Sequence, residues 1–354
     1  MNKIIDDFNN IISSKLGFEL RKYQVHVVKE VIEKIEAGQR FIIVSMPTGS
    51  GKTLLEMCVA YYAFTQNKGR ILALEPTRFL CDQMYSGVNR GLWSAVFEEK
   101  VGKEYEGNCE SFFENKKIII STPQTALKCS SMLKNEFNFV IIDEAHHAFG
   151  GKYYADLLLN LKPQVVIGFT ALLPSYKKYE LHDELRNELG DPCLLFYDFK
   201  KLKEIDPDYD PPKAIADLFD AEFSDGENSI YDMLFRGIIE GNPQNIKFLG
   251  LTLARFGKEA FCESYGNAKT KNKVASEAII EEFCSRNDPS HKSRSLLEIL
   301  NVYDVMNNDA LRPVLVFTSR KATANEFKEI IANHFKPIEE RIIVLTSDIS
   351  REAR

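Results

Sequence analysis

Five short runs rich in Ile, Val and Phe most constrain what this chain can fold into, because segments with helical spacing of apolar residues separate them. The runs are residues 41–45, 71–75, 117–121, 139–143 and 165–170. Such runs, apolar at nearly every position, are typical of parallel strands buried on both faces of a sheet. A repeated order of strand, helix and strand predicts an open parallel α/β sheet.

The pattern changes after residue 170. From about residue 175 to residue 300 the apolar residues follow helical spacing, and the acidic, proline-containing stretch 204–240 is expected to begin as an extended linker. Strands are predicted again at 314–318 and 341–346, on either side of a helix at 322–333. The sequence therefore predicts three parts: an α/β domain at 1–175, a mostly helical insert at 176–300 and only the beginning of a second α/β domain at 301–354.

Residues 46–53, Met-Pro-Thr-Gly-Ser-Gly-Lys-Thr, follow the first apolar run and open a helical pattern. This is the context of a phosphate-binding loop, in which glycines let backbone amides converge on an anion at a helix N-terminus. Lys52 is expected to reach the β and γ phosphates, and the Thr53 hydroxyl to hold Mg²⁺. Because Met46 replaces the motif's first glycine, a glycine-rich turn without a ligand is the alternative. The candidate nucleotide-binding residues of the loop are Thr48, Gly49, Ser50, Gly51, Lys52 and Thr53.

Asp143 and Glu144 stand at the carboxyl end of the fourth apolar run, and His146 and His147 follow them. Open α/β sheets bind their ligands at this edge. We expect Asp143 to hold Mg²⁺ through water and Glu144 to orient and deprotonate an attacking water, with Lys52 as the third catalytic residue. A solvated helix start and a histidine metal site are the alternatives. Because a phosphate loop precedes it in the sequence, the acidic pair indicates nucleotide hydrolysis.

These motifs resemble those of the superfamily 2 helicases, and the resemblance implies RecA-like domains that use ATP and Mg²⁺. Segment 21–24, Arg-Lys-Tyr-Gln, resembles the family's Q motif, so Arg21 and Gln24 are expected at the adenine, whose edge a planar amide can read. Segment 168–171, Gly-Phe-Thr-Ala, resembles motif III, which implies that Thr170 and His146 couple the nucleotide site to strand movement. The chain continues Leu-Leu-Pro where the family usually has a second small hydroxyl residue, a departure that concerns coupling more than hydrolysis.

Three further segments resemble the family's contacts with nucleic acid. Segment 75–80 resembles motif Ia, segment 121–125 the Ser/Thr-Pro motif, and segment 315–320 motif IV at the opening of a second RecA-like domain. Hydroxyls, backbone amides and Arg78 at such positions are suited to contact phosphates without reading bases. The residues assigned to nucleic acid by this resemblance are Pro76, Thr77, Arg78, Thr122, Pro123, Gln124, Thr318, Ser319 and Arg320.

The helical insert narrows the resemblance to the Hef and FANCM branch of repair helicases and to the related RIG-I-like receptors. The resemblance implies an ATP-dependent DNA helicase or translocase that acts on forked or branched DNA. An RNA-dependent ATPase, and a sensing module that uses nucleotide as a switch without unwinding, are the alternatives. The family's last motifs, with its arginine finger, are expected beyond Arg354, so we expect residues 1–354 alone to hydrolyse ATP poorly.

The formal net charge of −6 argues at first against a nucleic-acid partner. Residues 204–240 alone contain eleven acidic and two basic residues, so the rest of the chain is slightly basic, as contacts with phosphates at a few loops require. Basic residues of the insert, near Tyr265 and Phe283, are either a clamp on duplex nucleic acid or a solvated helical face. They are Lys269, Lys271, Lys273, Arg286, Lys292 and Arg294.

The seven cysteines lie at least 20 residues apart and form no C-x-x-C pair. This spacing predicts neither a zinc site nor disulfides, and we expect buried thiols in a reducing, cytoplasmic setting in a prokaryotic or archaeal cell. The N-terminus lacks the apolar run of a signal peptide, and no stretch approaches the ~20 apolar residues that cross a bilayer. A membrane partner is therefore not expected, and nothing in the sequence indicates the oligomeric state.

Overall fold

The computed structural model describes residues 1–86, 92–131, 133, 135–148, 152–171, 183–211, 216–308, 311, 313–335 and 341–345. Across these ranges, no helix is both long enough and apolar enough to span a bilayer. The chain divides into two compact units, Met1–Lys213 and Ala214–Arg354.

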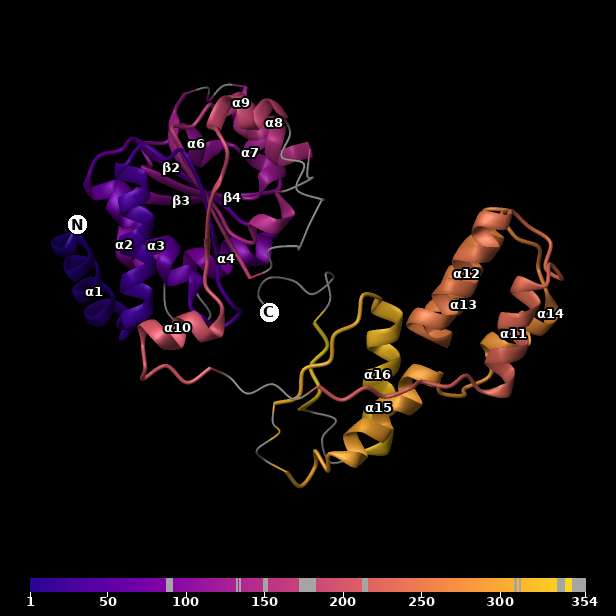
Figure 1. Cartoon of the computed structure of the whole chain (residues 1–354). Helices are drawn as coiled ribbons and strands as arrows, with labels where there is room; N and C mark the ends of the chain where they lie inside the picture. The colour runs from indigo at the N-terminus through magenta and orange to yellow at the C-terminus, as the bar shows by residue number, and fades with distance from the viewer. Residues whose placement is uncertain are drawn as a thin grey trace. The chain divides into compact units, whose positions relative to one another are not determined.

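A sheet of seven parallel strands forms the centre of the first unit (Figure 1). All five strands predicted from the apolar runs are present, and their ends differ from the prediction by at most two residues. The open parallel α/β sheet is therefore confirmed. Across the sheet the order is β3 (Val101–Glu104), β4 (Ile118–Ser121), β2 (Arg70–Leu74), β5 (Phe137–Ile142), β6 (Val165–Thr170), β1 (Phe41–Ser45) and β7 (Cys193–Phe196).

The sheet continues beyond the expected domain boundary at residue 175. Strand β7 pairs with β1 in parallel, from Ile42 opposite Cys193 to Ser45 opposite Phe196. Helix α10 (Phe199–Ile205) follows β7 and packs on helix α2 (Lys22–Glu36). The first unit therefore ends at Lys213, about 40 residues later than the sequence predicted. The four-residue run of β7 is too short for periodicity to distinguish a strand from a helical segment.

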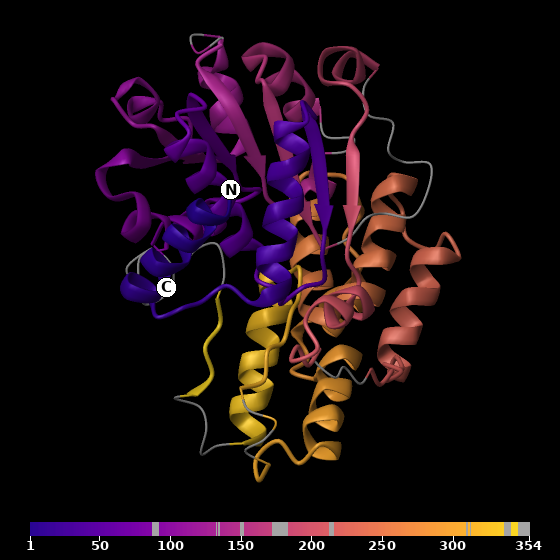
Figure 2. The same cartoon turned by 60° about the vertical axis from the view of Figure 1, so that its left-hand side comes forward.

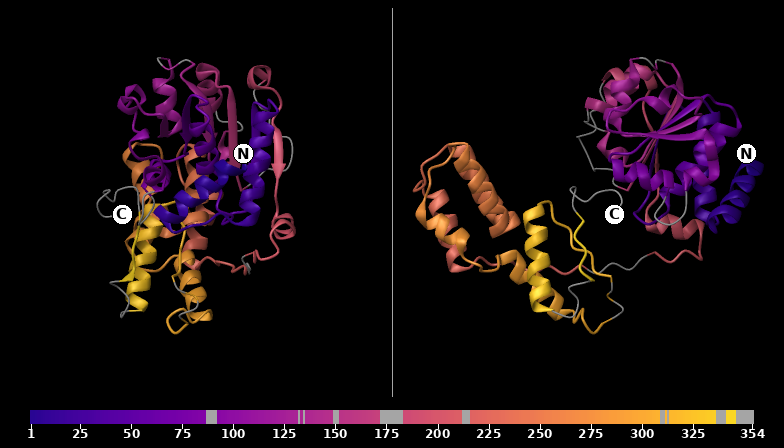
Figure 3. Two further views of the ribbon diagram at one scale, coloured as in Figure 1. Left: turned by 90° about the vertical axis from the view of Figure 1, so that its left-hand side faces the viewer. Right: turned by 180° about the vertical axis from the view of Figure 1, so that it is seen from behind.

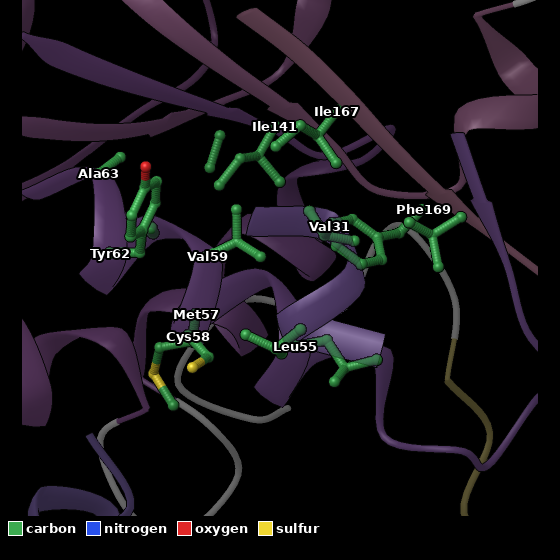
Figure 4. Close-up of a cluster of buried hydrophobic side chains, with 14 of the residues drawn as sticks. Val31, Leu55, Met57, Cys58, Val59, Tyr62, Ala63, Ile141, Ile167 and Phe169 are labelled. Carbon is green, nitrogen blue, oxygen red and sulfur yellow. The ribbon is translucent and has the colours of Figure 1, made fainter. Parts of the chain in front are cut away.

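Helices cover both faces of this sheet, so successive strand residues enter two different cores. Ile42 and Val44 belong to the core under α1 (Asn2–Leu16), α2, α3 (Lys52–Thr65), α4 (Arg78–Ser86) and α5 (Trp93–Phe97). Phe41 and Ile43 belong to the opposite core, under α6 (Glu110–Phe113), α7 (Pro123–Ser130), α8 (Lys152–Leu161) and α9 (Asp183–Leu189). Figure 4 shows side chains of α3, among them Leu55 and Val59, with Ile141, Ile167 and Phe169 of the sheet.

The second unit is helical in the residues that the structure describes (Figures 2 and 3). Residues 216–224 have no regular structure, which agrees with the predicted extended linker. Four helices then surround a core that includes Leu253, Phe261 and Ile280, and two more helices follow. The helices are α11 (Asp225–Phe235), α12 (Pro243–Phe256), α13 (Lys258–Thr270), α14 (Ala278–Ser285), α15 (His291–Val302) and α16 (Lys321–His334).

Two predicted strands of the second unit do not form. Helix α16 confirms the predicted helix at 322–333, but residues 314–318 and 341–345 have no strand structure, and residue 346 lies outside the described ranges. Their apolar side chains stay exposed, with Leu315 at 75% and Phe317 at 89% of full exposure. A run of apolar residues becomes a strand only when a neighbouring strand pairs with its backbone, and among the described residues of this unit none does.

The cysteine prediction is wrong for four of the seven residues. Disulfides join Cys109 to Cys129 and Cys262 to Cys284, with the paired Cα atoms 6.0 Å and 5.6 Å apart. The free cysteines are Cys58, Cys81 and Cys193, and the first two are buried as expected. Sequence separation does not report the distance between Cα atoms in the fold, and that distance decides whether two cysteines can be bridged.

Candidate nucleotide-binding and catalytic site

The carboxyl ends of neighbouring strands bring the predicted motifs to one edge of the sheet. Strand β6 lies between β1, which precedes the phosphate loop, and β5, which precedes Asp143. Strand β6 itself ends at Thr170, and the carbonyl oxygen of Thr170 accepts a hydrogen bond of 2.9 Å from the amide of Met46. Segments more than 90 residues apart in sequence therefore meet where parallel α/β sheets bind ligands.

The phosphate loop has the backbone that an anion site requires. Gly49 and Gly51 have φ angles of 80° and 78°, in the left-handed region that glycine adopts at little cost. A Cβ atom at Gly51 would lie 2.4 Å from Nε2 of Gln24, so any other residue here would strain the backbone and displace the side chain of Gln24. Thr48 and Gly49 are exposed, and Lys52 and Thr53, the first two residues of α3, are half-buried. The loop therefore places Lys52 and Thr53 at a helix N-terminus that opens to solvent.

Gln24 contacts the phosphate loop in this structure. Its side chain is 3% exposed, its Nε2 donates to the carbonyl oxygen of Ser50 at 3.0 Å, and its Oε1 accepts from the backbone amide of Arg21 at 2.8 Å. The hydroxyl of Tyr23 donates to the same carbonyl of Ser50, at 2.9 Å. Arg21 is exposed, with its guanidinium 5.6 Å from the centre of the Tyr209 ring. An adenine contact by Gln24 remains a prediction. To make it, the side-chain amide of Gln24 would have to break its two hydrogen bonds, with Ser50 and with Arg21.

Asp143 and Glu144 occupy a turn directly after β5. The backbone amide of Asp143 donates to Leu74 of strand β2, and its carboxylate accepts from the amide of Glu144 at 2.7 Å. Glu144 itself has φ 45° and ψ 49°, a left-handed conformation that is uncommon for a residue with a side chain. Burial raises the pKa of Asp143, and the charge of Glu144 adds to this effect.

His146 links the acidic turn to the end of strand β6. Its Nδ1 lies 3.0 Å from the hydroxyl of Thr170 and 3.2 Å from Oε2 of Glu144. Burial lowers the pKa of His146, and the neighbouring His147 lowers it further. A Cβ atom at Gly168 would lie 2.7 Å from Cβ of Ala145, so glycine permits this close approach of β6 to the turn. The structure thus brings the two residues predicted to couple, His146 and Thr170, into contact.

Two glutamates that the sequence analysis did not assign lie beside Asp143. Glu56 of helix α3 and Glu75, directly after β2, each place a carboxylate oxygen within 4.8 Å of the others and of Asp143. Both are almost fully buried. Two sequence signals could have identified these residues. Glu56 lies one turn after Lys52 in helix α3, and Glu75 follows β2, a strand next to β5. Carboxylate oxygens are the ligands that hard divalent cations prefer, so these residues fit Mg²⁺.

Five of the residues predicted to contact nucleic acid line one cavity of the first unit. This cavity has a volume of about 550 Å³ and lies at the ends of β2 and β4. Arg78 forms an ion pair with Glu106 at its rim, and Nζ of Lys128 donates to the carbonyl oxygen of Gly107 at 2.9 Å. Pro123, the first residue of α7, is buried. The cavity is lined by Pro76, Thr77, Arg78, Glu106, Gly107, Thr122, Gln124, Thr125 and Lys128.

The remaining nucleic-acid candidates belong to the second unit. Arg320 precedes helix α16 with its guanidinium 5.1 Å from the centre of the Phe256 ring, and its amide donates to the hydroxyl of Thr318 at 3.4 Å. Ser319 is exposed. The structure does not place these residues relative to the first unit, so their contact with nucleic acid stays a prediction.

The proposed clamp of the insert is partly a structural feature of its own helices. Tyr265 and Phe283 are 3% and 8% exposed and belong to the core. Lys269 pairs with Glu281 at 2.7 Å, and Arg286 pairs with an acid on its own helix. Lys271 and Lys273 are exposed. The clamp and the solvated helical face therefore both stay predictions for the exposed residues Lys271 and Lys273.

The first unit of the chain is similar to known proteins. Residues 17–175 match the family model described as the res subunit of type III restriction enzymes. A Methanocaldococcus jannaschii protein named as a candidate ATP-dependent RNA helicase is 29% identical over 43% of this chain and 20% of its own length. The ATP-dependent DNA helicase MPH1 of Candida glabrata is 30% identical over 40% of this chain and 13% of its own length.

A solved structure with a similar outline is the helicase domain of Hef from Pyrococcus furiosus. It covers 89% of this chain, which in turn covers 78% of that structure, with 19% identity and a TM-score of 0.47. The chain spans only a fifth or less of the two relatives above.

Proposed function

We propose that the first unit of this chain is a helicase domain of superfamily 2 and the ATP-hydrolysing motor of a DNA translocase or helicase. The observation that carries the proposal is the meeting of the phosphate loop, the Asp143–Glu144 turn and the end of β6 at one sheet edge. This arrangement places the ammonium group of Lys52, the N-terminus of helix α3 and the carboxylates of the Asp143–Glu144 turn around the same space. A triphosphate nucleotide is the substrate that such a set suits.

Each residue of the set has a separate task in this proposal. Lys52 and the amides of the phosphate loop hold the phosphates, and Thr53 with Asp143 would hold Mg²⁺, which neutralises phosphate charge when bound. Glu144 orients a water molecule and accepts its proton. His146, whose Nδ1 lies 3.0 Å from the hydroxyl of Thr170 and 3.2 Å from Oε2 of Glu144, connects the acidic turn to strand β6. The catalytic groups are positioned by backbone and neighbouring side chains, which is how phosphoryl transfer enzymes lower their barrier.

Forked or branched DNA is the substrate that we favour, and the helical insert supports this choice. The cavity with Arg78 and Lys128 presents cations, hydroxyls and a helix N-terminus, which suit phosphates of either nucleic acid. Of the two relatives described above, MPH1 is named as a DNA helicase and the Methanocaldococcus jannaschii protein as an RNA helicase. An RNA-dependent ATPase is therefore the second candidate. Measuring the ATPase rate with forked DNA and with duplex RNA separates the two, since only the true substrate stimulates hydrolysis.

Substitution of Lys52 tests the nucleotide site directly. We expect Lys52→Ala, in the complete protein, to lower ATP turnover at least ~100-fold, because it removes a cation that stabilises the transferred phosphate. Lys68→Ala, an exposed lysine beyond the end of α3, is the matched control and should turn over ATP like the unmodified chain. Turnover that survives Lys52→Ala would contradict the assignment of the loop.

A further inference from the structure

The magnesium site expected from the sequence uses Thr53 and Asp143. The structure places two further carboxyl groups, those of Glu56 and Glu75, beside Asp143. The three residues come from helix α3, from the end of β2 and from the end of β5, so only the tertiary fold brings them together. One carboxylate oxygen from each lies within 4.8 Å of the other two. Three acids at such distances repel one another strongly unless positive charge or protons compensate them.

Hydrogen bonds compensate this group only at Asp143, whose carboxylate accepts from the amide of Glu144. Glu56 is 0% exposed, and neither of its carboxylate oxygens has a hydrogen-bond partner among the described residues. Glu75 is 2% exposed, and its Oε2 also lacks a partner in the same ranges. A carboxylate that is removed from water without any partner costs several kcal/mol, so side chains of this kind are usually paired or bound to a metal.

The charges nearby leave room for a cation. Burial raises the pKa of Glu56 well above its ordinary value, and the charges of Asp143 and Glu75 add to this effect, while Lys52 acts in the opposite direction. Burial also raises the pKa of Glu75, with Asp143 and Glu144 as further causes. The ammonium group of Lys52 supplies one positive charge against the three carboxyl groups.

The spacing of the oxygens suits a hard divalent cation. Ligands on opposite sides of Ca²⁺, at 2.3–2.6 Å, lie roughly 4.6–5.2 Å apart, and across Mg²⁺ they lie about 4.1 Å apart. One oxygen of each acid lies within 4.8 Å of the other two, which is inside the upper limit for two ligands of Ca²⁺, and a small rotation of the glutamate side chains would bring them inside the limit for Mg²⁺. Their all-oxygen chemistry excludes the soft metals that prefer thiolate or imidazole ligands.

We propose that Glu56, Glu75 and Asp143 form a divalent-cation site that binds Mg²⁺ or Mn²⁺ before any nucleotide is present. The site deepens the proposed function, and it rests on that function only in the shared use of Asp143. Its consequence is an ion held by the protein at the sheet edge when the triphosphate arrives. In an ordinary site of this kind the ion is bound mainly through one carboxylate and the substrate phosphates.

Metal binding to the nucleotide-free chain tests the proposal. After removal of metals, Mn²⁺ is added to the complete protein, and free Mn²⁺ is measured by electron paramagnetic resonance. We expect one ion per chain, with binding at least ten times weaker in Glu56→Gln and in Glu75→Gln. We also expect Mn²⁺ to raise the Tm of the unmodified chain and to leave the Tm of both variants unchanged. Glu326→Gln, a buried glutamate of the second unit with an unpartnered oxygen, is the matched control and should bind like the unmodified chain.

The possible outcomes separate this proposal from the ATPase assignment. No Mn²⁺ binding without nucleotide, or binding that Glu56→Gln and Glu75→Gln leave intact, overturns the three-acid site. The loss of turnover in Lys52→Ala is a separate result and can hold in either case. If Glu75→Gln does not fold in the absence of metal, Glu56→Gln decides alone, since glutamine on helix α3 keeps the size of the side chain and removes its charge.

Discussion

Residues 41–45 of the first unit and residues 314–318 of the second are both five-residue runs of mainly Ile, Val, Leu and Phe. In the first run every residue is buried, because β6 and β7 pair with β1 on its two sides and helices cover both faces. In the second run the apolar side chains from Val314 to Phe317 are 43% to 89% exposed, and no strand forms.

The comparison shows that an apolar run specifies a strand only together with its neighbours. The residues 342–345 would be the natural partners of 314–317, and they too form no strand, with Ile343 and Leu345 exposed. Both segments, with one side of α16, line an apolar cavity of about 930 Å³. A single pair of strands is marginal in water, and a covered sheet of three or more strands is needed for independent stability.

Amide hydrogen exchange gives the largest expected difference between the two runs. The amides of β1 should exchange only when the first unit opens, whereas those of residues 314–317 should exchange at nearly the rate of an unfolded peptide. We expect protection in β1 to be at least about a thousandfold greater, the low end of ordinary folding equilibria. Mass spectrometry of peptides from the complete chain measures both. Equal protection would mean that 314–317 is paired in solution and would remove the distinction.

A pair of matched substitutions gives the next largest effect. Leu72→Ala in strand β2 removes a side chain that is 0% exposed and should lower the free energy of unfolding by about 2–5 kcal/mol. Leu315→Ala removes the same atoms at a site that is 75% exposed and should change stability by less than about 0.5 kcal/mol. Denaturant unfolding measures both changes: the fluorescence of Trp93, the one tryptophan of the chain, reports the first unit, and circular dichroism reports helices. A large cost at Leu315 would show that its side chain is buried in solution.

Acidification should distinguish the units through their buried glutamates. Burial alone would raise the pKa of Glu227 in the second unit, but hydrogen bonds from His291 and from the backbone of Ser224 and His291 lower it to about 2. The carboxylate also lies 2.8 Å from Nδ1 of His291 and 3.2 Å from Arg294. A depressed pKa stabilises the fold above the unfolded value near 4.5, so this contribution, about 2–3 kcal/mol, is lost between pH 4.5 and 2.

The first unit should respond in the opposite direction over a higher pH range. Its Glu56 and Glu75 have raised pKa values, so in the absence of metal the folded state holds more protons than the unfolded state above pH 4.5. Its stability should therefore rise as the pH falls from 7 towards 5. Urea unfolding at several pH values measures both effects, and Glu227→Gln should remove the loss below pH 4.5. The exposed residue Glu240 provides the control as Glu240→Gln. A parallel response of the two units would refute this assignment.

Much of the proposed nucleotide site was predictable because its signals are local. Lys52 and Thr53 follow a strand and begin a helix, and Asp143 follows another strand, so a parallel sheet places them at one edge. The position of Gln24 was not predictable in the same way. The hydrogen bonds of its side-chain amide with Ser50 and Arg21 depend on how helix α2 packs beside the phosphate loop.

The amino-acid sequence by itself determined the parallel strands of the first unit, the helical character of the second and the identity of the phosphate loop and acidic turn. Hydrophobic periodicity and residue order within a few positions carry this information. Only the tertiary structure decided which cysteines pair, where the first unit ends and whether 314–318 becomes a strand. It also decided that Glu56 and Glu75 meet Asp143. Each of these is a distance between residues far apart in the chain, and such distances are set by packing and by pairing with neighbouring strands rather than by local pattern.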